Sequence, residues 1–301
     1  MEHQRVVNGA CPHDCPDTCA MKITVDAGGR AVSVKGDPEH PITAGFLCGK
    51  VSNYLDRVYA DDRLLHPLIR TGPKGAAQFR RATWEEAIAL SARRLRETID
   101  EHGGASVLPY SFMGTQGMLQ SGSIAYRFMN AIGASKLERT ICASAGLAGV
   151  RATQGASPEV DPEDWPHARY LLIWGWNPMS TAPHLWKKLL EARRAGARLV
   201  VVDPFRSRTA AVADEHLRPL PGTDAALALG MMRAVVDAGL QDEAWCRAHA
   251  DGYDDLLARL AERSVDECAA TCGVPADAIA RVAHGFARTQ PAKPCATRAI
   301  A

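Results

Sequence analysis

The clearest hydrophobic pattern lies in the second half of the chain. Three short apolar runs, residues 169–175, 197–203 and 216–220, alternate with two longer segments, residues 182–196 and 223–239, in which apolar positions recur every three or four residues. Unbroken apolar runs are typical of strands buried on both faces, whereas the longer period is that of an amphipathic helix. Together they predict a parallel sheet with helices on both of its faces.

The first half of the chain has shorter and more varied patterns. Residues 21–36 alternate apolar and polar positions on either side of a glycine-containing turn, which predicts a β-hairpin. Thr83 and Glu86 have the spacing of a capping box in front of an amphipathic segment that ends at Gly103. We therefore expect a helix between Thr83 and Gly103.

The hydrophobic patterns on either side of residues 169–239 are less distinct. Residues 105–111 predict a buried strand, and the stretch from there to about residue 134 predicts a helix interrupted by glycines. Helices dominate residues 242–288, where Pro275 is well placed to open the last one. Residues 291–301 have no periodicity, and we expect an irregular end.

Composition places the chain among ordinary globular proteins. Its 301 residues have a mass of 32.4 kDa, with 47% hydrophobic and 23% charged residues and a net charge of +1. This length is enough for about two domains. The charge balance argues against a nucleic-acid partner, and no apolar run reaches the roughly 20 residues of a membrane span. The first residues contain no export signal, so we expect a cytoplasmic protein.

Cysteines carry the strongest chemical signal. In a reducing compartment, nine of them indicate metal binding or catalysis rather than disulfides. Four lie near the amino terminus with the spacing C-x3-C-x3-C-x28-C: Cys11, Cys15, Cys19 and Cys48. Pro12 and Pro16 disfavour a helix here, so we expect a loop that directs the sulfurs inward. Four soft ligands suit a cubane iron–sulfur cluster, whereas zinc, the alternative, usually takes its cysteines from two close pairs.

Glycines and polar residues follow the predicted strands of the second half. Eight of them are candidates for binding a nucleotide: Gly175, Asn177 and Pro178, then Asp203 and Arg206, then Gly222, Thr223 and Asp224. The carboxyl ends of parallel strands converge at one sheet edge, where open α/β folds bind nucleotides. Asp203 can accept a hydrogen bond from a guanine or a ribose, and Arg206 can pair with a phosphate. No G-x-G-x-x-G is present, so a turn at Asp203 and helix capping by Thr223 and Asp224 remain alternatives.

Six motifs occur in the order found in one enzyme family. They are CPHDCPDTC, GFLCGK, RTICASAGLAG, IWGWNP, VVDPFRSRTA and LPGTDAALALGMM. Up to about residue 290 the chain resembles the molybdenum and tungsten bis-pterin oxidoreductases related to formate dehydrogenase, nitrate reductase and dimethyl sulfoxide reductase. The resemblance implies an α/β fold with three parts. These are a [4Fe–4S] domain over residues 1–65, an incomplete Rossmann-like molybdopterin domain over residues 66–290 and an irregular tail over residues 291–301.

The resemblance also implies cofactors and a role for one lysine. The cofactors are a [4Fe–4S] cluster and a molybdenum or tungsten ion on two molybdopterin guanine dinucleotides, with the eight strand-end residues binding guanosine and pyrophosphate. Lys50, two residues after Cys48, is implied to lie between the cluster and a pterin. A cation there would stabilise the reduced cluster and raise its potential. A surface lysine without function is the alternative.

Other cysteines receive different interpretations. Cys142, in TICASAG, occupies the position at which the resemblance implies a cysteine or selenocysteine ligand of the metal, with a buried core cysteine as the alternative. Formate dehydrogenases have a histidine directly after this residue, whereas the chain has Ala143, which argues against formate oxidation. Cys268 and Cys272 are four residues apart in a helical segment without a histidine partner, which predicts core packing.

The function implied by the resemblance is a redox enzyme. It would exchange electrons with a small-molecule substrate and pass them through the cluster to a partner subunit or carrier. Two alternatives remain: a non-catalytic iron–sulfur module for electron transfer or interaction, and a non-redox hydratase or transhydroxylase of the same superfamily. Chains of the family are more than twice as long, so we expect a truncated or frameshifted fragment that is inactive by itself, with an intentionally short subunit as the alternative.

Overall fold

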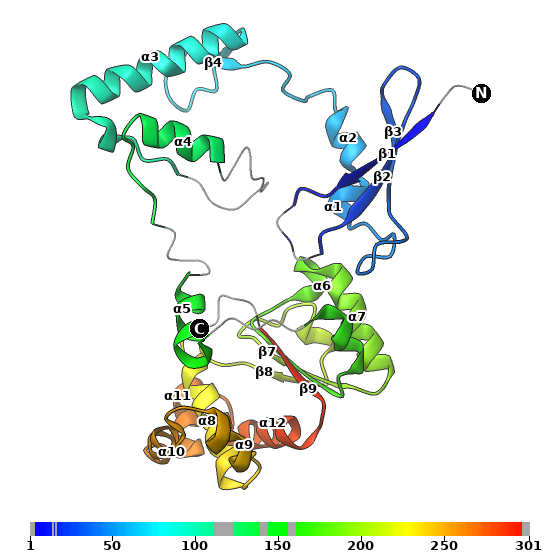
Figure 1. The fold of residues 1–301 in the computed structure, drawn as a ribbon, viewed down its shortest axis with the longest axis vertical. Coiled ribbons are helices and arrows are strands. Elements are labelled where there is room, and N and C mark those ends of the chain that lie inside the picture. Colours follow the sequence, from blue (N-terminus) through cyan, green and yellow to red (C-terminus); the bar gives the residue numbers. More distant parts are fainter. Residues whose placement is uncertain are drawn as a thin grey trace. The chain divides into compact units, whose positions relative to one another are not determined.

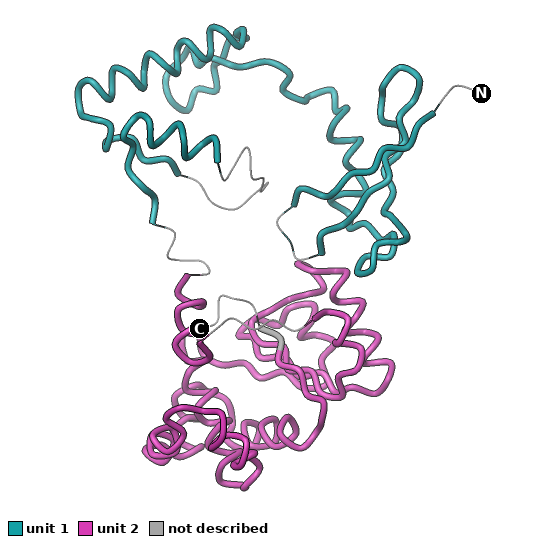
Figure 2. Tube along the Cα trace, in the orientation of Figure 1, with its two compact units in different colours: residues 1–139 teal, residues 140–301 magenta. Residues whose placement is uncertain are grey.

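The chain divides into two compact units, residues 1–139 and residues 140–301 (Figure 2). The computed structural model describes residues 4–13, 15, 17–110, 123–138, 144–155 and 161–296, with only the backbone of residues 295 and 296. None of the helices in this part of the chain combines the length and the apolar character needed to cross a bilayer.

Unit 1 begins with an antiparallel sheet of order β1-β2-β3. Short helices, a two-stranded ribbon and two longer helices follow (Figure 1). The bounds are β1 (Arg5–Ala10), β2 (Ala20–Val25), β3 (Ala31–Gly36), α1 (Gly49–Ser52), α2 (Tyr54–Val58), β4 (Leu68–Arg70), β5 (Phe79–Arg81), α3 (Trp84–His102), the 3₁₀ helix η1 (Gly104–Ser106) and α4 (Ile124–Ala131). Strands β2 and β3 pair from Met21 opposite Gly36 onward, which confirms the predicted hairpin.

Helix α3 starts and stops where its sequence predicts. The Thr83 hydroxyl accepts a hydrogen bond from the Glu86 amide at 3.2 Å, and the Glu86 carboxylate accepts one from the Thr83 amide at 2.9 Å. Gly103 ends the helix with a φ of +78°, which a residue with a Cβ adopts only under strain. These local signals are sufficient to define the helix, since none of its residues is buried.

The predicted strand at residues 105–111 is wrong for its described part, residues 105–110. The chain leaves η1 there without strand pairing, and Leu108 and Tyr110 are 54% and 89% exposed. The Val107 carbonyl instead accepts a hydrogen bond from the Ser135 amide, beyond α4, at 2.9 Å. An apolar run forms a strand only where another strand pairs with it. Helix α4 confirms the last part of the predicted glycine-interrupted helix, and residues 111–122 lie outside the described residues.

Unit 2 contains a four-stranded sheet of order β8-β7-β6-β9 in which every neighbouring pair is parallel. The bounds are α5 (Ser144–Gln154), η3 (Pro162–His167), β6 (Tyr170–Trp174), α6 (Pro178–Thr181), α7 (Pro183–Arg194), β7 (Arg198–Val202), η4 (Ala210–Val212), β8 (Glu215–Leu217), α8 (Asp224–Asp237), α9 (Glu243–His249), α10 (Tyr253–Ala261), α11 (Val265–Cys272), α12 (Ala276–Arg288) and β9 (Ala292–Ala296). The predicted parallel α/β architecture is confirmed. Pro275 directly precedes α12, as expected.

Both faces of this sheet are buried. On one face, alternate residues of β6 and β7 form a core with α8, α11 and α12: Tyr170, Leu172, Val200 and Val202. The residues between them point to the opposite face and are 0% exposed: Leu171, Ile173, Leu199 and Val201. Cys268 and Cys272 are buried on α11, which confirms core packing for that pair.

The expected irregular end is wrong for residues 292–296. These residues form β9, in which Ala292 pairs with Tyr170 and Pro294 with Leu172. The strand has no apolar alternation, because pairing with the open side of β6 determines its conformation. Pro294 is compatible with this place because β9 is the outermost strand of the described sheet, where an amide can be absent.

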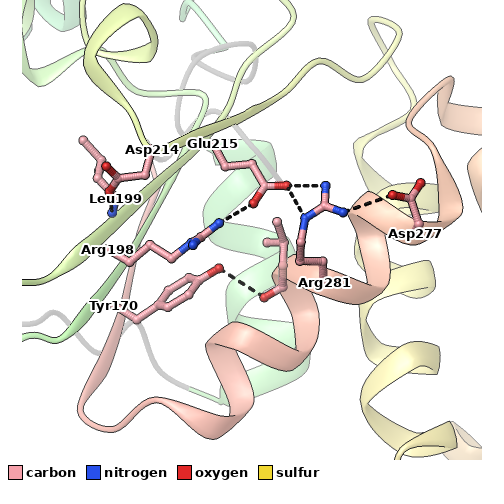
Figure 3. Close-up of polar contacts among 8 residues, drawn as sticks. Tyr170, Arg198, Leu199, Asp214, Glu215, Asp277 and Arg281 are labelled. Carbon is pink, nitrogen blue, oxygen red and sulfur yellow. Dashed lines mark hydrogen bonds and ion pairs between the residues drawn. The ribbon is translucent and has the colours of Figure 1, made fainter.

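A charged network fastens α12 to the sheet edge at which β7 and β8 begin. Glu215 accepts hydrogen bonds from Arg198 at 2.7 Å and from two nitrogens of Arg281 at 2.8 and 3.1 Å (Figure 3). Arg281 also pairs with Asp277 at 3.0 Å. The Glu215 side chain is 13% exposed, whereas both arginines are about half exposed. Glu215 is therefore the centre of the network.

Replacing Glu215 by alanine should lower the free energy of unfolding of unit 2 by about 1 kcal/mol. Three charge-assisted bonds are lost, but the exposed arginines regain water, so the cost stays near the lower end for such bonds. Urea unfolding followed by tryptophan fluorescence measures the change. Glu262→Ala, which removes an exposed pair with Arg259, serves as the control and should change stability less. Equal effects of the two variants would contradict a special role for Glu215.

Candidate metal centre and ligand-binding edge

Three of the predicted metal ligands lie on the connection between β1 and β2. Cys11 directly follows β1 and Cys19 directly precedes β2, and the Cys11 amide donates a hydrogen bond to the Cys19 carbonyl at 2.9 Å. This bond continues the β1–β2 pairing by one step and fixes the two ends of the loop. Cys15 lies between them, and its amide donates to the His13 carbonyl at 3.0 Å.

The fourth cysteine comes from the start of a helix. Cys48 is the N-cap of α1, and its carbonyl accepts hydrogen bonds from the Val51 and Ser52 amides, each at 3.0 Å. The chain returns to the hairpin just before this helix, where a Cβ on Gly36 would overlap the Gly45 carbonyl. A glycine is therefore required at position 36 for this close approach.

The surroundings of Cys15 and Cys19 oppose ionisation of their thiols. Burial, which is the largest cause, and negative charge on Cys11, Asp17, Cys15 and Cys48 together raise the pKa of Cys19 to about 12. Burial also raises the pKa of Cys15, with charges on Cys11 and Cys48 among the smaller causes. Partly buried thiols become thiolates when a metal supplies compensating positive charge. The donor set, three soft sulfurs on the β1–β2 connection and a fourth at the N-cap of α1, fits an iron–sulfur cluster.

The other two predicted site residues of this centre are Lys50 and Cys142. Lys50 is exposed on α1, two residues after Cys48. Cys142 lies outside the described residues. Among the described residues, no three His, Cys, Asp or Glu side chains converge closely enough to hold a single metal ion.

The carboxyl edge of the sheet in unit 2 gathers the predicted nucleotide-binding residues, because the strands are parallel. Gly175 follows β6 with a φ of +56°, and its amide donates to the Val202 carbonyl at 2.8 Å. Asn177 and Pro178 then begin α6, and Pro178 is buried. A sharp turn therefore brings the polar residues to the edge directly after β6.

Asn177 connects two of the loops at this edge. Its side-chain oxygen accepts a hydrogen bond from the Thr209 hydroxyl at 2.7 Å, and its amide nitrogen donates to the Ser180 hydroxyl at 3.1 Å. The Thr209 hydroxyl in turn accepts from the Met179 amide at 3.3 Å and is 0% exposed. Sequence reasoning missed Thr209, although it lies in the VVDPFRSRTA motif.

The loop after β7 forms the turn that was the alternative for Asp203. The Asp203 carboxylate accepts a hydrogen bond from the Phe205 amide at 2.8 Å, while its carbonyl bonds with His216 Nε2 at 2.8 Å. Arg206 is exposed beside Phe205, which is 73% exposed. The turn uses one carboxylate oxygen of Asp203 and presents the arginine to solvent.

The loop before α8 does not contain the side-chain cap that was the alternative role for Thr223. Gly222 has a φ of +82°, and Thr223 occupies the N-cap position of α8. The Thr223 hydroxyl does not cap the helix but donates to the Leu220 carbonyl at 2.6 Å. Asp224, the first residue of α8, accepts a hydrogen bond from Trp174 Nε1 at 2.7 Å. The end of β6 is thus joined to the start of α8 through Trp174, which was not among the predicted site residues.

Comparison with known families gives the class of protein. Residues 4–60 match the family model described as molybdopterin oxidoreductase Fe4S4 domain, and residues 63–298 match that described as molybdopterin oxidoreductase. The chain belongs to the molybdopterin oxidoreductase family. The predicted family is confirmed, as are its cofactors, a [4Fe–4S] cluster and molybdenum or tungsten on molybdopterin.

Individual relatives have several activities. The chain is 40% identical to "Probable oxidoreductase YoaE" of Bacillus subtilis over 286 residues, 95% of this chain and 42% of the relative. It is 34% identical to a nitrate reductase of Symbiobacterium thermophilum, covering 90% of this chain and 37% of the relative. Among solved structures, acetylene hydratase from Pelobacter acetylenicus superposes with a TM-score of 0.75 at 27% identity, covering 97% of this chain and 40% of that one. The chain spans about two fifths of the length of these relatives.

Proposed function

We propose that this chain provides the cluster domain and part of the pterin-binding domain of an oxidoreductase that carries molybdenum or tungsten on two molybdopterin guanine dinucleotides. The observation that carries the proposal is the placement of four cysteines, three on the β1–β2 connection and one at the N-cap of α1, within the segment that matches the Fe4S4 family model. The family match over residues 63–298 supports the pterin part.

The proposal assigns roles to the residues of unit 1 and to the domain bounds. Cys11, Cys15, Cys19 and Cys48 hold the cluster as thiolates, within a cluster domain over residues 1–65 and ahead of a pterin-binding domain over residues 66–290. Lys50 supplies positive charge beside them. The thiolates exclude other ligands from the iron, and the lysine stabilises the charge that reduction adds.

The residues beyond unit 1 bind the other cofactor. Cys142 is the protein ligand of the metal. The loops at the carboxyl edge of the sheet hold the guanosine and pyrophosphate parts, using the glycine turns for close approach and Arg206 for a phosphate. When bound, the metal supplies two-electron exchange with a small-molecule substrate, and the cluster supplies single-electron transfer to a partner subunit or carrier.

Metal analysis tests this function. The chain, reconstituted anaerobically and supplied with the pterin cofactor, should contain iron, sulfide and molybdenum or tungsten. Iron without the second metal would favour a non-catalytic electron-transfer module. Zinc in place of iron would contradict the proposal.

A non-redox hydratase is the second candidate, because the acetylene hydratase structure superposes over 97% of this chain. The two functions differ in whether substrate turnover changes the oxidation state of the cluster. In an oxidoreductase, turnover changes the oxidation state of the cluster, which electron paramagnetic resonance detects. A loaded enzyme that converts its substrate while the cluster signal stays constant would favour the hydratase.

Lys50→Ala should lower the reduction potential of the cluster without loss of iron. The variant removes a positive charge two residues from Cys48, and the reduced cluster is the more negative state. Because Lys50 is exposed, the shift should shrink as salt is added. Lys74→Ala, at another exposed lysine of unit 1, is the control for a change in net charge. An equal potential in both variants at low ionic strength would assign Lys50 to the surface.

A further inference from the structure

Phe205 is an exposed aromatic side chain at the carboxyl edge of the sheet in unit 2. It lies in the loop that follows β7, and 73% of its surface is exposed. Its amide donates a hydrogen bond to the Asp203 carboxylate at 2.8 Å, and its carbonyl accepts one from the amide of the buried Ser207 at 2.8 Å. Because both backbone polar groups of Phe205 are bonded, the turn holds the point from which the ring projects.

Contacts from β8 hold the same turn from its other side. His216 Nε2, on β8, bonds with the Asp203 carbonyl at 2.8 Å. Arg218, directly after β8, donates from its Nε to the Pro204 carbonyl at 3.4 Å. Phe205 is therefore an apolar ring presented to water on a turn that neighbouring elements already fix. Such a preorganised surface loses little conformational entropy when a ligand binds to it.

The side chains next to this ring are cationic. Arg206 and Arg208 are both exposed, one on each side of the buried Ser207. Within the part of unit 2 that the structure describes, the ion pairs are made by other cations, so both guanidinium groups are available to a ligand. A flat apolar face beside guanidinium groups has the chemistry that a nucleobase attached to phosphates requires.

We propose that Phe205 is the platform on which the guanine base of the cofactor stacks, with the diphosphate bound by the guanidinium groups of Arg206 and Arg208. This inference rests on the proposed binding of guanosine and pyrophosphate at this edge, and it assigns the base to a side chain for which the sequence analysis gave no role. Stacking covers an aromatic face that is otherwise in water, which accounts for the exposure of Phe205. The ring contributes affinity for the base, and the arginines contribute affinity for the anion.

The test measures the binding of guanosine diphosphate and of inorganic pyrophosphate to the full chain by isothermal titration calorimetry. In Phe205→Ala the affinity for guanosine diphosphate should fall about 5- to 150-fold, the range for loss of one stacked aromatic ring, while the affinity for pyrophosphate stays unchanged. Phe205→Leu keeps an apolar side chain without a flat face and should also lose affinity. Phe205→Tyr keeps the ring and should bind as the parent chain does. Arg206→Ala should weaken the binding of both probes.

Trp245→Ala is the control for loss of an exposed aromatic side chain from the same unit. Trp245 is 59% exposed on α9, which supplies no residue to the strand-end loops, and its ring lies against that of His249 with centroids 5.0 Å apart. This variant should bind both probes as the parent chain does.

Unchanged affinity of Phe205→Ala for guanosine diphosphate would overturn the stacking role. Equal losses for the two probes would also overturn it, because the ring would then support the loop rather than the base. Either result leaves the proposed nucleotide site intact. A parent chain that binds neither probe would instead contradict the nucleotide site and the stacking role together.

Discussion

Replacing Cys19 by serine should reduce iron in the reconstituted chain from about four atoms to a small fraction of that number. Cys19 is 2% exposed and its carbonyl is bonded to the Cys11 amide, so its sulfur cannot be replaced by another ligand without opening the β1–β2 connection. Because metal binding and folding are coupled at such sites, residues 1–65 should also lose resistance to proteolysis. Iron and sulfide analysis and limited proteolysis measure the two effects.

Serine replacement at Cys11, Cys15 or Cys48 should likewise lower the iron content and the protease resistance of the reconstituted chain. Cys246→Ser, on α9 in unit 2, is the matched control, since this cysteine is also partly exposed and lies outside the loop. It should retain the iron and the protease resistance of the parent chain. Equal iron in all five variants would refute ligation by the four amino-terminal cysteines.

Asn177→Ala should lower the free energy of unfolding of unit 2 by about 1–3 kcal/mol and release the guanine-containing cofactor that we propose to bind at this edge. The change leaves the Thr209 hydroxyl, which is 0% exposed, without the oxygen to which it donates at 2.7 Å, and a buried unsatisfied group costs this much. It also disconnects the loop after β6 from the loop after β7. Urea unfolding and nucleotide analysis of the denatured chain measure the two effects.

Two further variants separate the effect of the Asn177–Thr209 hydrogen bond from that of the other Asn177 contacts. Ser180→Ala removes the partner of the Asn177 amide nitrogen but keeps the bond to Thr209, so it should be close to the parent chain. Asn177→Asp keeps an acceptor oxygen and should recover part of the stability. If Ser180→Ala is as unstable as Asn177→Ala, the Thr209 bond is not the cause.

Local signals made a large part of the fold predictable. The strands β6 and β7 are 0% exposed at Leu171, Leu199 and Val201, so their sequences are apolar without interruption and the type of sheet follows. The capping box of α3 involves residues three positions apart and is visible in the sequence. The four cysteines are likewise recognisable by spacing, which is a property of the chain before it folds.

The rest depends on residues that are distant in the sequence. The bond between Trp174 and Asp224 joins positions 50 residues apart, and the bond between Asn177 and Thr209 joins positions 32 residues apart. Neither pairing has a local pattern, so Trp174 resembled the end of an apolar strand and Asp224 a helix cap. Strand β9 was missed for the same reason, because its structure comes from pairing with β6.

The position of β9 has a consequence for synthesis of the protein on the ribosome. The pairing of β6, β7 and β8 can be complete once Leu217 has emerged, whereas β9 starts at Ala292, 75 residues later. At roughly 5–20 residues per second, this interval lasts about 4–15 s. During it, one side of the apolar strand β6 lacks its final neighbour and can pair with another nascent chain. Once β9 is in place, Pro294 lies in the outer strand and removes one backbone donor, so the finished sheet is a poorer template for such pairing.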